Sequence, residues 1–470
     1  MMLLFLGGLP RRSGLAALLV CLGVMLAANP AFAVGERVVD VRIAGNLRTG
    51  EDTVRSLAGI RIGDTLEADT LAAVRERLNT VGLFADVNVW WENYGGGVRV
   101  NILVKDKFPW APVPTGSWSA NNKSLGLLFV HGNLFGRGKQ MVVGGKLANL
   151  DSGLLLAYRD PALFSSWVFW EMKVIAQRQI IPEYSIYDRA PTSPWRQTTL
   201  DAYGIEPALG VAWFRRVKTQ VSWRFDKVVY QEKGLKVLDP VTGNPEPLDP
   251  VNQATTRGGY MGLGRAAVAF DWRAREFAVM RGSALGGSLD FGGPAFGGDF
   301  RFWRASAFWE QGFRILRRHN FIYAAGGTLG HNLPIWWDTV AGGPGLRGYL
   351  GQQFRGDSQL FAKVEYHFPL FSLGSLDVRG VTFYDAAAIW FRSLPTETNA
   401  AGYLVRQGGD MRTFNPAFQV KGFDANRNFH HDVGAGLRFF LRSVAVPLVG
   451  FDGGLSLESH DWRFLLIVGA

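Results

Sequence analysis

The chain has 470 residues but only one cysteine, Cys21, which lies within the first 33 residues. We predict that residues 1–33 are a cleaved export signal, because Arg11 and Arg12 precede a short apolar core and "AFA" at 31–33 is an A-x-A cleavage site. The apolar run is short for the alternative, a membrane anchor. The processed chain would then lack cysteine, which excludes a disulfide, a thiolate nucleophile and a cysteine metal site.

Catalytic motifs are also missing. The sequence has no H-E-x-x-H, G-x-S-x-G or P-loop pattern. Its seven histidines are dispersed, and the adjacent pair, His430 and His431, would point to opposite sides of an extended chain. We therefore predict a protein that is not an enzyme and that has no catalytic residue, no metal site and no cofactor.

Long apolar runs are absent beyond residue 33, so no segment there could form a membrane-spanning helix. The remaining way for a chain to cross lipid is a closed β-barrel. The net charge is +10, yet the lysines and arginines are scattered singly among aromatic residues. Because they form neither runs nor a helical stripe, we do not expect nucleic acid to be a partner.

What the sequence has instead is a long series of alternating segments. In "VKTQVSWRFD", residues 217–226, Val221 and Phe225 share one face, and Arg224 and Asp226 share the other. "FAKVEYHF" and "DVGAGLRFFLR" alternate in the same way. A soluble sandwich also alternates. Large aromatic residues on the apolar faces and full charges of both signs on the polar faces, however, favour a membrane barrel whose charges line the lumen.

Residues 36–107 have a different pattern. An alternating strand, two segments with helical periodicity and two further strands predict the order β-α-α-β-β, with both helices on one face of a small sheet. The next segment, "KFPWAPVP" at 107–114, contains three prolines and is predicted to be a linker. The expected domains are therefore 34–107 and a barrel at 108–470.

Connection lengths agree with a membrane barrel, in which short periplasmic turns alternate with long outside loops. If the glycine-rich segment at 342–351 belongs to an outside loop, the next connection, 369–376, should be short. The one after it, 393–431, should be long. Both expectations fit the sequence, and 231–259 would be another outside loop.

The segment "GGPGLRGYLG" at 342–351 also fits the G-x-G-x-x-G spacing of a dinucleotide-binding turn through Gly343, Gly345 and Gly348. Such a turn needs a helix directly after it. Here Pro344 lies inside the motif, and the following residues lead into an alternating strand. We therefore exclude a nucleotide site.

Several segments carry a family resemblance. "GGPGLRGY" resembles the arginine-glycine-aromatic loop tip of the BamA/TamA outer-membrane assembly superfamily, whose relatives include two-partner-secretion transporters. "GNLFGRGKQ", "YRDPALF", "AKVEYHFPL", "VTFYDAAAIW" and "DVGAGLRFF" are similar to its barrel motifs, and 36–107 resembles one POTRA domain. The resemblance implies a mainly β fold, a 16-stranded antiparallel transmembrane β-barrel preceded by one small α+β POTRA domain.

The resemblance also implies a site. The loop around 335–358 would fold into the barrel, where Arg347 would meet Glu365 and Asp385 on the inner wall, with Gly348 and Tyr349 completing the tip. Arginine suits this role because its planar fork bonds carboxylates bidentately and stays charged. The glycines at the tip, above all Gly345 and Gly348, would allow a tight turn and a close approach to the wall, and Gly343 would precede them.

The implied function is insertion of outer-membrane proteins or translocation of polypeptides in a bacterial outer membrane, with the POTRA domain in the periplasm. Implied partners are outer-membrane lipid, unfolded outer-membrane or secreted clients, and periplasmic chaperones. A client would add a strand to an open sheet edge. The first and last barrel strands, expected at 116–130 and 461–470, would pair weakly. Two alternatives stay open: a secretion transporter dedicated to one partner protein, and a passive pore.

Overall fold

A computed structural model of the chain describes residues 35–163, 167–185, 188–194, 196–213, 216–231, 236–238, 245–246, 258–276, 278–393, 397–398, 404–405, 413–414, 421–441 and 447–469. The predicted export signal lies outside these residues. The chain divides into two compact units. The first runs to Pro109 and includes Phe135–Gly138, and the second contains Trp110–Leu134 and everything from Lys139 onward.

The first unit is a small α+β domain. Its elements are β1 (Val38–Ala44), α2 (Glu51–Ala58), α3 (Thr70–Val81), β2 (Phe84–Tyr94) and β3 (Gly97–Asp106). The sheet order is β1-β3-β2, so β1 and β2 are both edge strands. Val54 and Ala58 of α2 and Val74 and Leu78 of α3 pack on the buried face of the sheet. The predicted β-α-α-β-β order is confirmed.

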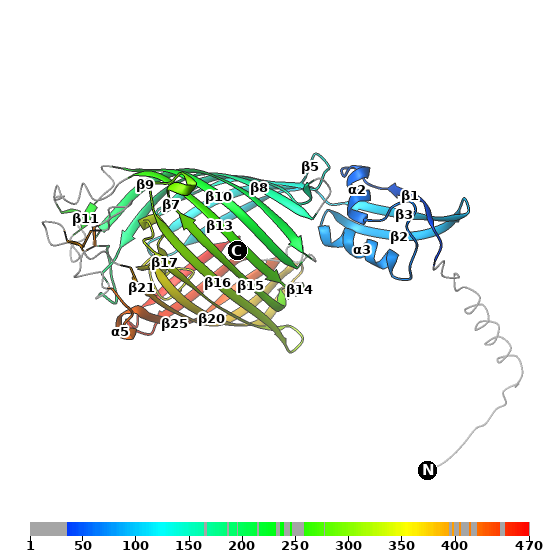
Figure 1. Cartoon of the computed structure of the whole chain (residues 1–470). Helices are drawn as coiled ribbons and strands as arrows, with labels where there is room; N and C mark the ends of the chain where they lie inside the picture. Colours follow the sequence, from blue (N-terminus) through cyan, green and yellow to red (C-terminus); the bar gives the residue numbers. More distant parts are fainter. Residues whose placement is uncertain are drawn as a thin grey trace, which may run out of the picture. The chain divides into compact units, whose positions relative to one another are not determined.

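The second unit is a closed antiparallel barrel of sixteen long strands within the described part of the chain (Figure 1). The strands are β4 (Trp110–Trp118), β5 (Lys123–Leu134), β6 (Lys139–Ala148), β7 (Asp151–Asp160), β8 (Val168–Glu183), β9 (Arg196–Trp213), β10 (Val217–Tyr230), β13 (Gly259–Asp271), β15 (Val279–Gly292), β16 (Phe302–Ile315), β17 (His319–His331), β20 (Ser358–Leu373), β21 (Leu376–Trp390), β25 (Phe429–Leu441), β26 (Pro447–Ser456) and β27 (Trp462–Val468). Each pairs with its neighbours along the chain, and β27 closes on β4. The predicted barrel is confirmed.

Shorter elements lie in the connections between these strands. They are β11 (Lys236–Leu238), β12 (Pro245–Glu246), β14 (Ala274–Glu276), η3 (Pro294–Phe296), η4 (Ile335–Trp337), β18 (Thr339–Ala341), β19 (Phe354–Gly356), β22 (Glu397–Thr398), β23 (Leu404–Val405), β24 (Thr413–Phe414) and α5 (Ala425–Asn428). No helix in the described ranges is both long enough and apolar enough to cross a bilayer.

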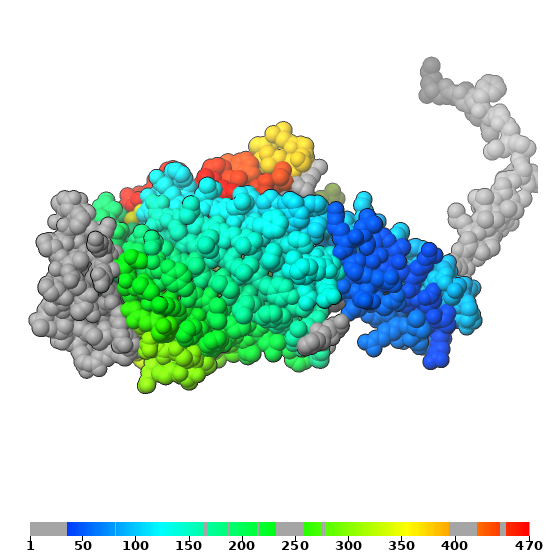
Figure 2. Space-filling model, turned by 90° about the horizontal axis from the view of Figure 1, so that it is seen from above, coloured from blue at the N-terminus to red at the C-terminus, as the bar shows by residue number. Residues whose placement is uncertain are grey.

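The two faces of the strands explain why the sequence closes into a barrel. Large apolar side chains point outward and stay uncovered, with Leu125 at 73%, Leu147 at 78% and Phe464 at 74% exposure. Figure 2 shows the outer face of β5 to β10 as a continuous surface of side chains. Charged side chains such as Asp226 and Asp290 point inward and are 1% exposed. An exterior this apolar is stable only when lipid covers it.

From β16 to β25 short and long connections alternate, whereas β6 and β7, near the start of the ring, are joined by only two residues at the end where the long connections lie. β20 ends at Leu373 and β21 begins at Leu376, so the predicted short turn within 369–376 is present. The glycine-rich segment lies in the connection from β17 to β20, at the opposite end of these strands. Parts of the predicted outside loops 231–259 and 393–431 lie outside the described residues.

The start of the barrel differs from the prediction. β4 already begins at Trp110, so most of the expected linker 107–114 is strand, and the expected first strand 116–130 spans the turn between β4 and β5. The linker was predicted because of the prolines in 107–114, but Pro112 and Pro114 lie within β4. β27 pairs with β4 only from Gly116 to Trp118, and proline is tolerated in a strand whose edge is unpaired. The last strand, expected at 461–470, is β27.

Candidate functional site

The site is built on the loop between β17 and β20. Its two limbs form a small hairpin of β18 and β19, in which the Thr339 hydroxyl donates a hydrogen bond to the Gly356 carbonyl at 2.8 Å. Gly343 has φ 60°, a left-handed conformation that glycine adopts without strain. The tip beyond it is buried, with Leu346 at 0% and Arg347 at 4% exposure. The loop therefore folds into the barrel.

Arg347 is the centre of the tip. Its Nε and Nη2 bond the two carboxylate oxygens of Asp385 on β21 at 2.7 and 2.9 Å. Its Nη1 lies 2.7 Å from Glu365 on β20 and 3.3 Å from Asp452 on β26. The guanidinium also lies over the Phe383 ring, 3.4 Å from the ring centroid. The structure thus brings Arg347, Glu365 and Asp385 together, with the bidentate bond going to Asp385.

Two carboxylates of this site were missed in the sequence. Asp452 accepts hydrogen bonds from both Nη atoms of Arg438, at 2.6 and 2.9 Å, as well as from Arg347. Asp432 on β25 accepts the Gly348 backbone N–H at 3.0 Å and lies directly opposite Asp385 in the strand ladder. Asp432 could have been found from the sequence, because it shares the polar face of its strand with Arg438. Asp452 could not, because the glycines that follow it hide the alternation of polar and apolar residues.

The remaining residues of the tip have distinct roles in packing. Tyr349 is 3% exposed, and its hydroxyl donates to the His431 carbonyl at 3.1 Å. Burial raises the pKa of the Tyr349 phenol above its ordinary value, so the hydroxyl stays protonated. At Gly348 a Cβ would come within 2.7 Å of the Ser456 nitrogen, whereas at Gly345 it would meet nothing closer than 3.5 Å. Of the two glycines expected to approach the wall, Gly348 does so, whereas Gly345 has room for a side chain.

The base of the loop is anchored on a different part of the wall. Leu333, Ile335 and Trp336 enter an apolar cluster with side chains of β8, β9, β10, β13 and β16. Next to them, the Trp337 ring lies near two guanidinium groups, with Arg224 at 4.9 Å and Arg304 at 4.6 Å from the ring centroid. The loop is thus fixed at two separate places, by apolar and cation–π contacts at its base and by ion pairs at its tip.

The tip also reaches the first hairpin of the barrel. Asn121, in the turn between β4 and β5, donates to the Gly351 carbonyl and accepts the Gly351 N–H, both at 2.9 Å. Asp452 and Gly348 meanwhile place the tip against β26, the strand next to β27. The loop tip is therefore bonded on both sides of the β27–β4 seam.

Residues 133–441, more than half of the chain, match the model of the Omp85 superfamily domain. The chain belongs to the Omp85 superfamily. Residues 36–107 match a POTRA model, the surface antigen variable number repeat. As an Omp85 protein it is an outer-membrane barrel whose POTRA domain lies in the periplasm, and this family of assembly and transport barrels is not enzymatic.

Individual proteins are similar to this chain over a short stretch of sequence or in fold. Over 58 residues the chain is 40% identical to the outer membrane protein assembly factor BamA of Neorickettsia risticii, a match that covers 12% of this chain and 8% of the relative. BamA of Haemophilus ducreyi lacking POTRA domains 1–3 aligns with a TM-score of 0.62 at 13% identity, covering 92% of this chain and 84% of that one. CdiB from Acinetobacter baumannii gives 0.57 at 12% identity, covering 92% and 74%. At these identities the two structures show a shared fold.

Proposed function

We propose that this Omp85 protein inserts outer-membrane proteins or translocates polypeptides, receiving unfolded clients at its POTRA domain and passing them to the barrel seam. The observation that carries the proposal is the seam itself. β27 and β4 are paired only through Leu466–Trp118, Ile467–Ser117 and Val468–Gly116. By contrast, β8 and β9 are paired along the whole of Val168–Glu183.

A short seam is the weakest joint of the barrel, because ladder hydrogen bonds hold neighbouring strands together. Pro112 and Pro114, which have no N–H to donate, precede the paired residues of β4. If β4 and β27 part, each exposes an edge on which another strand can form its own ladder. A client strand could thus enter the membrane without leaving its backbone groups unsatisfied in lipid.

We propose that Arg347, Gly348, Tyr349, Glu365 and Asp385 act as a lock in this process. Ion pairs at the tip hold the loop to β20, β21 and β26, and Asn121 joins the loop to the other side of the seam. While these bonds are intact, the tip opposes separation of the flanking strands. Opening of the seam would therefore be coupled to release of the tip.

The POTRA domain supports the first step of the proposal. Its edge strand β2 is 11 residues long, and β1 forms the other edge. Unpaired backbone groups on such edges can bond an extended polypeptide with little demand on its sequence. Outer-membrane lipid and periplasmic chaperones that deliver clients are further proposed partners.

Two other functions make different predictions. A transporter dedicated to one secreted protein would use the same seam or lumen for a single client. A passive pore needs an open lumen, which the buried loop does not favour. Depletion of the protein, followed by proteomics of outer-membrane and secreted fractions, separates them. Loss of many barrels supports general assembly, loss of one secreted protein supports a transporter, and unchanged proteomes with lower solute permeability support a pore.

A disulfide across the seam tests the mechanism directly. Ser117 and Ile467 are paired residues, so S117C/I467C should lock the seam and abolish client assembly, and a reductant should restore it. Each single cysteine variant is the matched control. Normal assembly with the disulfide formed would contradict a role for seam opening.

A further inference from the structure

Arg281 is an unusual charge because it lies on the lipid-facing surface of the barrel. Along β15 the exposed positions are Arg281, Leu285, Leu289 and Phe291, whereas Asp290 on the other face is buried among lumen arginines. Arg281 therefore shares its face with large apolar side chains that point away from the lumen. It is the third residue of its strand, so roughly 10 Å separate it from the end of the hairpin.

None of the ion pairs or hydrogen bonds among the described residues includes Arg281. Arg178 offers a direct comparison, since it also faces outward but bonds both carboxylate oxygens of Asp201, at 2.7 and 2.9 Å. An arginine on the lipid face of a barrel is unfavourable unless it reaches the interface or finds a counter-charge there.

Arg281 lies near the periplasmic surface of the membrane, and this level indicates which anion can neutralise it. The turn before β15 lies at the same end of the barrel as Trp110, where the chain enters from the periplasmic POTRA domain. Nearby exposed aromatic side chains, Trp272 at 45% and Phe313 at 46%, are of the kind that gathers where lipid meets water. At this level the abundant anion is the phosphate of a phospholipid, which a guanidinium binds bidentately.

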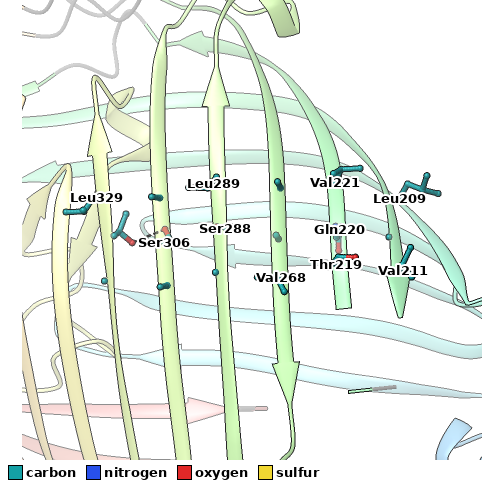
Figure 3. A pocket seen from close by; sticks show the side chains of 18 of the residues that line it. Leu209, Val211, Thr219, Gln220, Val221, Val268, Ser288, Leu289, Ser306 and Leu329 are labelled. Atoms are coloured by element: carbon teal, nitrogen blue, oxygen red, sulfur yellow. Dashed lines mark hydrogen bonds between the residues drawn. The ribbon is translucent and has the colours of Figure 1, made fainter. Parts of the chain in front are cut away.

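A hollow of about 1210 Å³ lies farther along the same surface (Figure 3). Gly287, Ala307 and Gly327 are direct neighbours across β15, β16 and β17 and form part of its floor. The exposed side chains of Leu289 and Leu329, labelled in Figure 3, border it. Its lining is almost entirely apolar, so it fits a hydrocarbon chain.

The spacing between the arginine and the hollow matches one lipid molecule. Gly287 is six residues from Arg281 on the same strand, which is roughly 20 Å at about 3.3 Å per residue. For a strand tilted by about 40°, that is about 15 Å of depth, somewhat more than half of an apolar band about 25 Å tall. We propose that Arg281 binds the phosphate of an anionic phospholipid in the periplasmic leaflet and that one of its acyl chains lies in this hollow.

The proposed lipid site lies on the side of the barrel opposite the seam. β13 and β15 stand at the midpoint of the strand order that begins with β4 and ends with β27, so the site lies opposite the seam. The strand segments that pair at the seam, Gly116–Trp118 and Leu466–Val468, carry no charge. A bound lipid would thus hold the wall opposite the seam and leave the seam free to move.

The test measures lipid binding and is independent of client handling. The full-length protein in detergent is titrated with dioleoyl phosphatidylglycerol, and bound lipid is counted by native mass spectrometry, with dioleoyl phosphatidylcholine for comparison. Arg281→Gln should weaken phosphatidylglycerol binding about tenfold, the effect of losing a charge-assisted contact. Arg317→Gln, which removes an exposed turn arginine from the neighbouring hairpin, is the matched control and should bind normally.

Further variants test each half of the site. Arg281→Lys should retain part of the affinity, and it replaces Arg281→Gln if that variant fails to fold. Ala307→Leu should weaken binding of the dioleoyl lipid but not of a short-chain phosphatidylglycerol. Normal binding by Arg281→Gln, or an equal loss in Arg317→Gln, would overturn the proposal. So would displacement of the lipid by inorganic phosphate, or preference for an acidic peptide over phosphatidylglycerol.

Discussion

Replacement of Arg347 by methionine should destabilise the barrel mainly through Asp385. Glu365 would keep its bond to His367 at 2.7 Å, and Asp452 would keep Arg438 at 2.6 and 2.9 Å. Asp385 is 0% exposed, and among the described residues its side chain forms hydrogen bonds with Arg347 alone. The substitution therefore leaves one buried carboxylate without a hydrogen-bond partner, although the Lys363 charge stands opposite Asp385 in the strand ladder.

The expected loss of stability in Arg347→Met follows from the cost of an unpaired buried charge. Loss of one partner from a buried ion pair costs about 3–5 kcal/mol, most of it the penalty for the charge left behind. Asp385→Asn in the Arg347→Met background removes that charge, and a neutral unsatisfied amide costs only about 1–3 kcal/mol. The double variant should therefore be about 2 kcal/mol more stable than Arg347→Met alone.

The free energy of unfolding can be measured by urea titration of the protein folded into lipid vesicles, with the 16 tryptophans as the fluorescent signal. Arg317→Gln serves as the control and should change stability by no more than about 0.5 kcal/mol, as exposed substitutions usually do. A loss below about 1 kcal/mol for Arg347→Met would contradict the proposed role of the Arg347–Asp385 ion pair. So would the absence of recovery with Asp385→Asn, or an equal recovery with Asp452→Asn.

Three further predictions concern the same loop. Gly348→Ala should cost about 1–3 kcal/mol, because its Cβ would meet the backbone of β26, whereas Gly345→Ala has room and should be neutral in the same titration. Trp337→Leu should lose about 1–2 kcal/mol of cation–π stabilisation and raise single-channel conductance by loosening the loop base; unchanged conductance would count against that anchor. Arg347→Glu and Glu365→Arg should each lower heat resistance on gels, and their combination should recover only part because Asp385 still repels a glutamate at 347.

The barrel could be predicted from the sequence because lipid and lumen impose opposite chemistry on alternate residues. Val221 is 59% exposed to the outside, while Asp226 on the inner face of the same strand is 1% exposed. This contrast repeats from strand to strand. The start of the barrel could not be predicted in this way. Pro112 and Pro114 look like linker residues until it is known that their strand lies at an incompletely paired seam.

The site was partly accessible to sequence reasoning. Arg347 and its two expected partners followed from a family resemblance, and alternation placed Glu365 on the inner face of its strand. The contributions of Asp432, Asp452 and Asn121 depend on which residues stand side by side in neighbouring strands. That register is set by pairing over the whole ring, so it cannot be read from any one segment.

The geometry of the tip connects the proposed lock to the proposed opening. Gly454 on β26 lies against the backbone of Arg347, where a Cβ would come within 2.6 Å of the Arg347 carbonyl carbon. On the other side of the seam, Asn121 makes two hydrogen bonds to Gly351. β26 is joined to β27, and Asn121 lies in the turn after β4. The bonds of the tip therefore add to those of the seam in opposing the separation of β27 from β4. A seam of three residue pairs can therefore stay closed at rest and still open when a few bonds at the tip are lost.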